Sequence, residues 1–144
     1  MIVAVSALHA EGLEWNTNLD KAIEISRATN KPLMLFFTGS DWCGWCKRLE
    51  AEVFLKPEFE KWAKENVVLL EVDFPRRTQL PQDLQTQNSQ LGQFFGVQGF
   101  PTIWFVKATK ADGKINFEKL GSSGYLDGGP PVWLKAADEI LKNK

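Results

Sequence analysis

The chain has 144 residues, of which 44% are hydrophobic and 24% charged, and its formal net charge is −1 at pH 7. This length and composition suit one globular domain with its own hydrophobic core. A net charge so close to zero gives no electrostatic case for binding nucleic acid or an anionic membrane surface. No apolar run approaches the roughly 20 residues of a membrane-spanning helix, so we expect no stable membrane insertion.

Residues 1–10, MIVAVSALHA, are apolar and rich in small side chains. They are compatible with the remnant of a cleaved signal peptide, but no basic segment precedes them and the apolar part is too short for a whole signal. An ordinary apolar lead-in fits as well, and both interpretations stay open. A signal remnant would place the protein outside the cytoplasm, where disulfides persist. We treat residues 1–12 as an N-terminal extension and residues 13–144 as one domain.

The first predicted elements are a helix and a buried strand. Residues 16–18, NTN, can cap a helix, and the apolar residues that follow recur at helical spacing up to about Thr29. Pro32 marks the end of this helix. The run LMLFF at 33–37 does not alternate between apolar and polar residues, so we expect a central strand buried on both faces.

The rest of the chain contains further helices and strands and closes with a hairpin and a helix. In chain order we predict a helix from the cysteine motif, a helix from Pro57, a strand over 67–72, a polar insertion-like stretch over 75–91 with a helix from Pro81, a strand over 102–106, a strand over 115–120 paired across an Asp112-Gly113 turn, and a helix after a glycine-rich loop at 121–129. This order predicts an α/β sandwich with a mixed sheet. We expect the insertion to cap the sheet, and shaping a partner site is the alternative.

The two cysteines of the chain, Cys43 and Cys46, form a Cys-x-x-Cys motif between the buried strand and the following helix. This arrangement suggests thiol–disulfide chemistry. Because Cys43 lies where the helix begins, unpaired N–H groups and the positive end of the helix dipole favour its thiolate. We predict that Cys43 attacks the substrate and that the more shielded Cys46 resolves the mixed disulfide.

Two other interpretations of the cysteines fit the sequence less well. A zinc site needs about four ligands, and His9 is the other candidate soft donor. A purely structural disulfide across so short a loop would restrain little chain entropy. We therefore predict a redox-active Cys43–Cys46 disulfide, with no metal and no further cofactor.

Three sequence blocks carry a resemblance to a known family: FFTGSDWCGWC, LLEVDFPRR and VQGFPTIWFV, in this order. Together they look like the periplasmic thioredoxin-like oxidoreductases called DsbH, described from chlamydiae. The resemblance covers nearly the whole chain from Leu13. It implies a thioredoxin fold with a central mixed sheet flanked by helices, an insertion before the third long strand, and a cis peptide bond before Pro101 at the start of that strand.

The same resemblance implies the direction and setting of the reaction. We predict a monomeric periplasmic disulfide reductase that acts on disulfide-containing exported proteins. A membrane reductant of the DsbD type would restore its dithiol. An oxidase or isomerase would use the same residues at another reduction potential. A non-catalytic thioredoxin-fold module that binds peptides on a Trp45–Phe100 surface is the alternative of a different class.

Aromatic residues beside the cysteines are candidates for substrate binding. We predict that Trp42 partly packs against the sheet edge and that Trp45, between the cysteines, is an exposed apolar platform together with Phe100. Simple packing is the alternative for both tryptophans. The resemblance implies that the Phe100 backbone lies beside Cys43, where a substrate strand can hydrogen-bond. The predicted substrate-binding residues are Trp42, Gly44, Trp45, Phe100 and Pro101.

The site also needs a proton acceptor for Cys46. Thioredoxins keep a buried Asp six residues before the first cysteine, and this chain has Phe37 there. We predict that Glu50 replaces it, because it lies four residues after Cys46 on the same helical face and matches an acid of DsbD-type domains. A solvent-facing glutamate is the alternative. Glu71 is a second candidate, whose side chain we expect to face away from the thiols.

Overall fold

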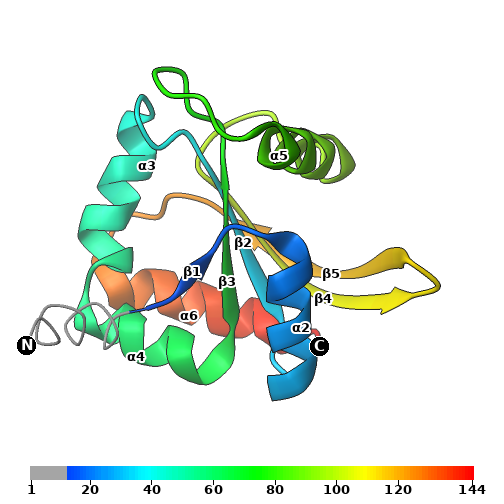
Figure 1. The fold of residues 1–144 in the computed structure, drawn as a ribbon. Coiled ribbons are helices and arrows are strands. Elements are labelled where there is room, and N and C mark those ends of the chain that lie inside the picture. The colour runs from blue at the N-terminus through cyan, green and yellow to red at the C-terminus, as the bar shows by residue number, and fades with distance from the viewer. Residues whose placement is uncertain (1–12) are drawn as a thin grey trace, which may run out of the picture.

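The computed structural model describes residues 13–144, which form one five-stranded sheet flanked by helices (Figure 1). The strand order is β1-β3-β2-β4-β5. The pairs β1–β3 and β3–β2 are parallel, whereas β2–β4 and β4–β5 are antiparallel, so the sheet is mixed as predicted. The elements are β1 Trp15–Asn16, α2 Leu19–Thr29, β2 Leu33–Thr38, α3 Gly44–Leu49, the π-helical turn η1 Glu50–Phe54, α4 Pro57–Asn66, β3 Val68–Asp73, α5 Gln82–Phe94, β4 Thr102–Ala111, β5 Lys114–Ser123 and α6 Gly129–Leu141.

The sheet lies between two hydrophobic cores, so its central strand β2 is buried on both faces along its whole length. Met34 and Phe36 point into the core that also contains Cys43 and Cys46, which we call the cysteine-side core. It lies under α3, α4 and α6. The far-side core, under α2 and α5, receives Leu33, Leu35 and Phe37 instead. Figure 1 shows α3 and α4 on one side of β2 and β3 and α2 and α5 on the other.

The hairpin predicted at Asp112-Gly113 is confirmed but is longer than expected. Both turn residues have positive φ, 54° and 77°, as a two-residue hairpin turn requires. Strand β4 extends beyond the predicted 102–106 to Ala111. This outer part pairs only with β5, outside the central sheet, so its residues can be polar and still continue the hairpin. Residues 121–123, predicted as loop, continue β5 and pair with the first half of β4.

The helix that begins at the cysteine motif changes geometry after one and a half turns. Helix α3 continues into η1, where the N–H of Leu55 donates to the carbonyl of Glu50, five residues earlier. Cys46, Leu49 and Val53 are fully buried on the inner side. The extra residue in this turn was not predicted, since π-helical turns depend on packing and are often found beside functional sites.

The stretch predicted as an insertion consists of a loop and a helix. Helix α5 connects β3 to β4 and packs on the far-side core through Leu91. The side chain of Gln87 accepts a hydrogen bond from the N–H of Leu19 at 2.9 Å, and Asn88 donates to the carbonyl of Asp73 at 3.0 Å. The loop before α5 lies beside the N-terminal end of α3 (Figure 1).

The predictions for the N-terminal extension at 1–12, including the signal remnant at 1–10 and His9, fall outside the described residues. Within residues 13–144, no helix combines the length and hydropathy that crossing a bilayer requires.

Candidate redox-active site

The sheet topology brings three chain segments to one edge. Parallel strands β2 and β3 end side by side at Thr38 and Asp73. Antiparallel β4 begins at the same edge, where Thr102 lies opposite Phe37. Consequently the loop that leads to the cysteines, the β3–α5 loop and the Phe100-Pro101 segment all meet there.

The Cys43–Cys46 disulfide spans the first turn of α3, with the two Cα atoms 5.3 Å apart. Cys43 is the N-cap residue, and its Sγ accepts a hydrogen bond from the backbone N–H of Cys46 at 3.2 Å. A thiolate at this position would be stabilised by that N–H and by the helix dipole. Cys43 is 5% exposed and Cys46 is fully buried, so Cys43 is the residue closer to solvent.

The loop before Cys43 is hydrogen-bonded to the end of β3 and to the β3–α5 loop. The Asp73 carboxylate accepts from the N–H and the hydroxyl of Ser40. The Asp41 carboxylate accepts from the N–H groups of Arg76 and Arg77 at 2.9 and 2.8 Å. These backbone hydrogen bonds lower the pKa of Asp41 below its usual value. The start of the insertion-like stretch therefore borders the loop that precedes Cys43, while α5 caps the sheet.

Trp42 forms one wall of the site. Its indole N–H donates to the carbonyl of Phe74 at 2.8 Å, and its ring packs edge-to-face on Phe100 at 5.7 Å. The guanidinium of Arg76 lies 3.6 Å from the ring centroid, a cation–π arrangement. A Cβ at Gly39 would collide with the indole, so this placement depends on a glycine there.

Trp45 is 55% exposed and has different partners. Its ring packs against Tyr125 at 5.0 Å, and the Arg48 guanidinium lies 5.2 Å from its centroid. Glu52 accepts from the Tyr125 hydroxyl and, at 2.7 Å, from Arg48, so one carboxylate holds both supports of the indole. Nothing in the sequence singled out Tyr125, because it comes from a loop 80 residues away. The ring contacts join Trp42, and not Trp45, to Phe100.

The remaining predicted binding residues lie between or beside these two aromatic groups. The Phe100–Pro101 peptide bond is cis, and both residues are half-buried. A Cβ added at Gly44 would meet no atom within 4 Å, so the backbone next to Cys43 borders open space.

The acidic side chains near the cysteines differ from our expectation. Phe37 points into the far-side core, where its ring contacts Phe95 at 5.9 Å, and Phe36 is its neighbour on the cysteine side. Glu71 lies opposite Phe36 in β3 and, like Leu69 two residues earlier, is on the cysteine side of the sheet. The expectation that Glu71 faces away from the thiols was therefore wrong.

Glu50 and Glu71 both have raised pKa values. Burial raises the pKa of Glu50, the negative charge of Asp73 adds to the increase, and Lys47 opposes it. Burial raises the pKa of Glu71 to about 7, with further contributions from Asp73 and Glu50. A carboxyl with such a pKa exchanges its proton near neutral pH.

We expect Glu71 to make the protein less stable as the pH rises. Its pKa is about 7 in the folded protein and about 4.3 in an unfolded chain, so the folded state binds the extra proton between these values. This contribution to stability is complete below about pH 4.3 and is lost as the pH rises through 7. Discounted for partial exposure, Glu71→Gln should raise the free energy of unfolding by about 1–2 kcal/mol at pH 8 and much less at pH 4.5.

Thermal unfolding at the two pH values measures this effect. The matched control is Glu118→Gln, which changes an exposed strand glutamate. Equal stabilisation by both substitutions, or none by Glu71→Gln, would contradict the prediction.

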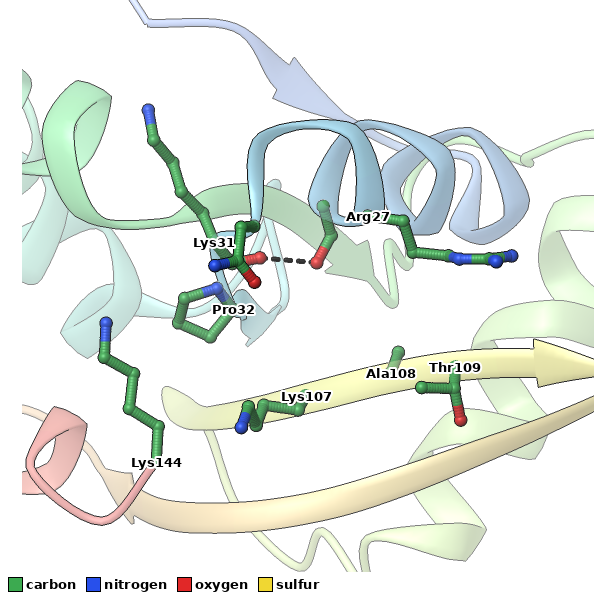
Figure 2. Close-up of a pocket in the computed structure, with 9 residues that line it drawn as sticks. Arg27, Lys31, Pro32, Lys107, Ala108, Thr109 and Lys144 are labelled. Carbon is green, nitrogen blue, oxygen red and sulfur yellow. Dashed lines mark hydrogen bonds between the residues drawn. The ribbon is translucent and has the colours of Figure 1, made fainter.

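A separate cavity of about 400 Å³ lies at the other end of β2, next to Pro32 (Figure 2). Basic side chains line it, and Figure 2 shows that Arg27 and Lys31 point in different directions. Lys31 donates to the carbonyl of Lys64 at 2.6 Å. Since the C-terminal end of α2 lies here, these cations offset the negative end of its dipole. This cavity is not part of the cysteine site, and within residues 13–144 no cluster of His, Cys, Asp or Glu is arranged to hold a metal ion.

Comparison with known proteins gives concordant matches. Residues 19–126 match a family model described as thioredoxin-like domain. The chain is 35% identical over 118 residues to the disulfide bond reductase DsbH of Chlamydia pneumoniae, covering 81% of this chain and 70% of that protein. It is 28% identical over 94 residues to the thioredoxin-related protein DsbJ of the same organism, covering 65% of this chain and 27% of that one. A solved structure of a DsbH oxidoreductase superposes with a TM-score of 0.79 at 32% identity, covering 92% of this chain and 87% of the other.

Proposed function

Because this chain belongs to the thioredoxin-like family and is a thiol–disulfide oxidoreductase of the DsbH type with Cys43 and Cys46 as its pair, we propose that it reduces disulfides in exported proteins. The observation that carries this proposal is the position of Cys43. It caps α3, accepts the N–H of Cys46, and adjoins open space at Gly44. A nucleophile in this position can reach a disulfide on another protein.

The reaction transfers two electrons from the dithiol to the substrate. The Cys43 thiolate attacks one sulfur of the substrate disulfide, so a new S–S bond forms while the other substrate sulfur leaves as a thiolate. Cys46, deprotonated, then attacks the Sγ of Cys43 and displaces the second substrate sulfur. The Cys43–Cys46 disulfide remains, and a donor must reduce it before the next cycle.

Substrate would bind between the two aromatic walls. Trp42 with Phe100 lies on one flank and Trp45 with Tyr125 on the other. Apolar contact with these rings, together with hydrogen bonds to the backbone before Pro101, would give binding with little sequence preference. We propose Trp42, Gly44, Trp45, Phe100 and Pro101 as the binding residues.

Similarity to DsbH and DsbJ supports a place in a Dsb redox pathway. We propose that the protein works as a monomer in the periplasm. A membrane reductant of the DsbD type would return electrons to Cys43–Cys46. The reductive direction is supported by the name of the relative that is 35% identical, a disulfide bond reductase.

Insulin reduction and a redox titration test this function. We expect the protein to catalyse insulin reduction by dithiothreitol and Cys43→Ser to leave only the background rate. Equilibration with glutathione should give a reduction potential nearer to the roughly −270 mV of thioredoxin than to the roughly −120 mV of DsbA. Equal inactivity of both proteins would favour the peptide-binding module, and a potential near that of DsbA would favour an oxidase.

A further inference from the structure

The cysteine side of the sheet carries acidic groups although its central strand has none. Met34 and Phe36 of β2 face this side, and Glu71 lies opposite Phe36 on β3. Glu50 begins η1, which continues the helix of the cysteines. Burial raises the pKa of Glu50 and the negative charge of Asp73 adds to the increase, while Asp73 and Glu50 both act on Glu71, so the three carboxyls are close enough to interact. We call Glu50, Glu71 and Asp73 the acidic cluster.

The members of the acidic cluster differ in their hydrogen bonds. Asp73 accepts two hydrogen bonds from Ser40, which fix it as a structural carboxylate. The carboxyl groups of Glu50 and Glu71 differ from that of Asp73, because burial and neighbouring charges, and no hydrogen bond within residues 13–144, shift their pKa values. Both are half-buried, so each can exchange a proton with solvent as well as with a buried group.

A buried hydroxyl lies beside the acidic cluster. Thr38 is fully buried and its Oγ1 has no hydrogen-bond partner within the described chain. Thr38 lies opposite Asp73, and alternation along β2 puts its side chain on the same face as Phe36. Buried hydroxyl groups almost always have partners, so the Thr38 hydroxyl is free to bind a further polar group on the cysteine side of the sheet.

We propose that Glu71 accepts the proton of Cys46 in the resolving step, directly or through one water. The negative charge of Glu50 adjusts how strongly Glu71 holds that proton. This proposal rests on the proposed function and names its base. The acid that is absent from β2 is thus supplied by the neighbouring strand, from the position opposite Phe36. Thr38, which can donate and accept, is suited to orient the thiol or the water.

The proposed step balances without any external reagent. The Cys46 thiol transfers its proton to the Glu71 carboxylate, and the resulting thiolate attacks the Sγ of Cys43 in the mixed disulfide. The bond from Cys43 to the substrate breaks, and the substrate leaves as a thiolate. Glu71, itself half-buried, then releases the proton to solvent.

The electrostatic surroundings of Glu71 suit this role. The charged groups that act on it are Asp73 of its own strand and Glu50 of the cysteine helix, while Lys47 acts on Glu50. The facing residues of β1 and β2 carry no charge. Because its pKa is about 7, a large share of Glu71 is ionised at neutral pH and can act as a base, and the same pKa lets it keep the proton that it accepts.

Reaction of the reduced protein with dithionitrobenzoate separates the two steps. The first thionitrobenzoate released reports attack by Cys43, and the second reports resolution by Cys46. For Glu71→Gln we expect an unchanged first phase and a second phase about 100-fold slower at pH 7. The difference should vanish above about pH 9, where the thiol ionises unaided. Glu71→Asp should restore part of the rate.

Two further variants sharpen the assignment. Glu50→Gln removes a negative charge next to Glu71, so the pH midpoint of the second phase should move down while the phase remains fast. Glu118→Gln, the solvent-facing strand control, should match the unmodified protein. A normal second phase in Glu71→Gln, or a slow one in Glu50→Gln alone, would overturn the proposal. A missing first phase in the unmodified protein would instead overturn the proposed function.

Discussion

A Cys46→Ser variant is expected to remain covalently attached to its substrates through Cys43. The first attack needs only Cys43, whereas release needs a second thiolate held beside its Sγ. Intramolecular groups in such positions act at effective concentrations of about 10⁵ M or more, far above any external thiol. Multiple turnover should therefore fall by at least about 10³-fold, while the initial adduct forms at the normal rate.

The adduct is detected on non-reducing gels and by mass spectrometry, with insulin as a defined substrate. Because Cys46 is fully buried, a serine hydroxyl could disturb the core, so Cys46→Ala serves as the second variant. Cys43→Ser should form no adduct. An adduct through Cys46 in the Cys43→Ser protein would reverse the two roles.

Local signals in the sequence were sufficient for the elements and for the cysteine centre. The uninterrupted apolar run at 33–37, the capping residues before Leu19 and the Asp112-Gly113 turn each determine structure within a few residues. The edge at which the site forms follows from the order of these elements, because β2, β3 and β4 meet there. The three local predictions are confirmed, whereas β1, the π-helical turn η1 and the full length of β4 and β5 were not predicted.

The side of the sheet that each residue faces could not be predicted in the same way. A strand that is apolar on both faces has no alternation, so counting back from Cys43 through a loop gave Phe37 where the structure has Phe36 on the cysteine side. The same uncertainty put Glu71 on the wrong face. Pairing with Phe36 across two strands determines its side, and this pairing is a tertiary property.

Contacts between distant segments were also missed. The Tyr125 ring that supports Trp45 and the Asp41 carboxylate that holds the β3–α5 loop join residues between 35 and 80 positions apart. Neither follows from any local pattern. Both contacts border the surface that we propose to bind substrate.

The proposed role of Glu71 connects the stability of the fold with its function. A glutamate that is half-buried beside two other carboxyls costs folding free energy at neutral pH, so replacing it should stabilise the protein. The same replacement should slow the resolving step. Opposite effects on stability and rate are typical of residues kept for chemistry, because activity often requires groups that the fold would be more stable without.

Replacing Trp133 with alanine should have the largest effect on stability. Trp133 is fully buried in α6, its ring contacts Phe54, Phe59, Trp62 and Phe105, and its indole N–H donates to the carbonyl of Gly124 at 3.0 Å. Truncating a buried aromatic side chain costs about 3–5 kcal/mol, and the carbonyl left without its donor adds to this loss. Domains of this size have total stabilities of about 5–15 kcal/mol, so Trp133→Ala should lower Tm by about 10 °C or more.

Trp133→Phe separates packing from hydrogen bonding, because it keeps a ring and removes the donor to Gly124. We expect an intermediate loss of about 1–2 kcal/mol. Since Gly124 precedes the Tyr125 ring that supports Trp45, this variant should also raise KM for insulin more than it lowers kcat. Val132→Ala, at the exposed neighbouring position, should change stability by no more than about 0.5 kcal/mol. If Trp133→Ala unfolds at the same temperature as Val132→Ala, α6 is not the support of the cysteine-side core that its contacts indicate.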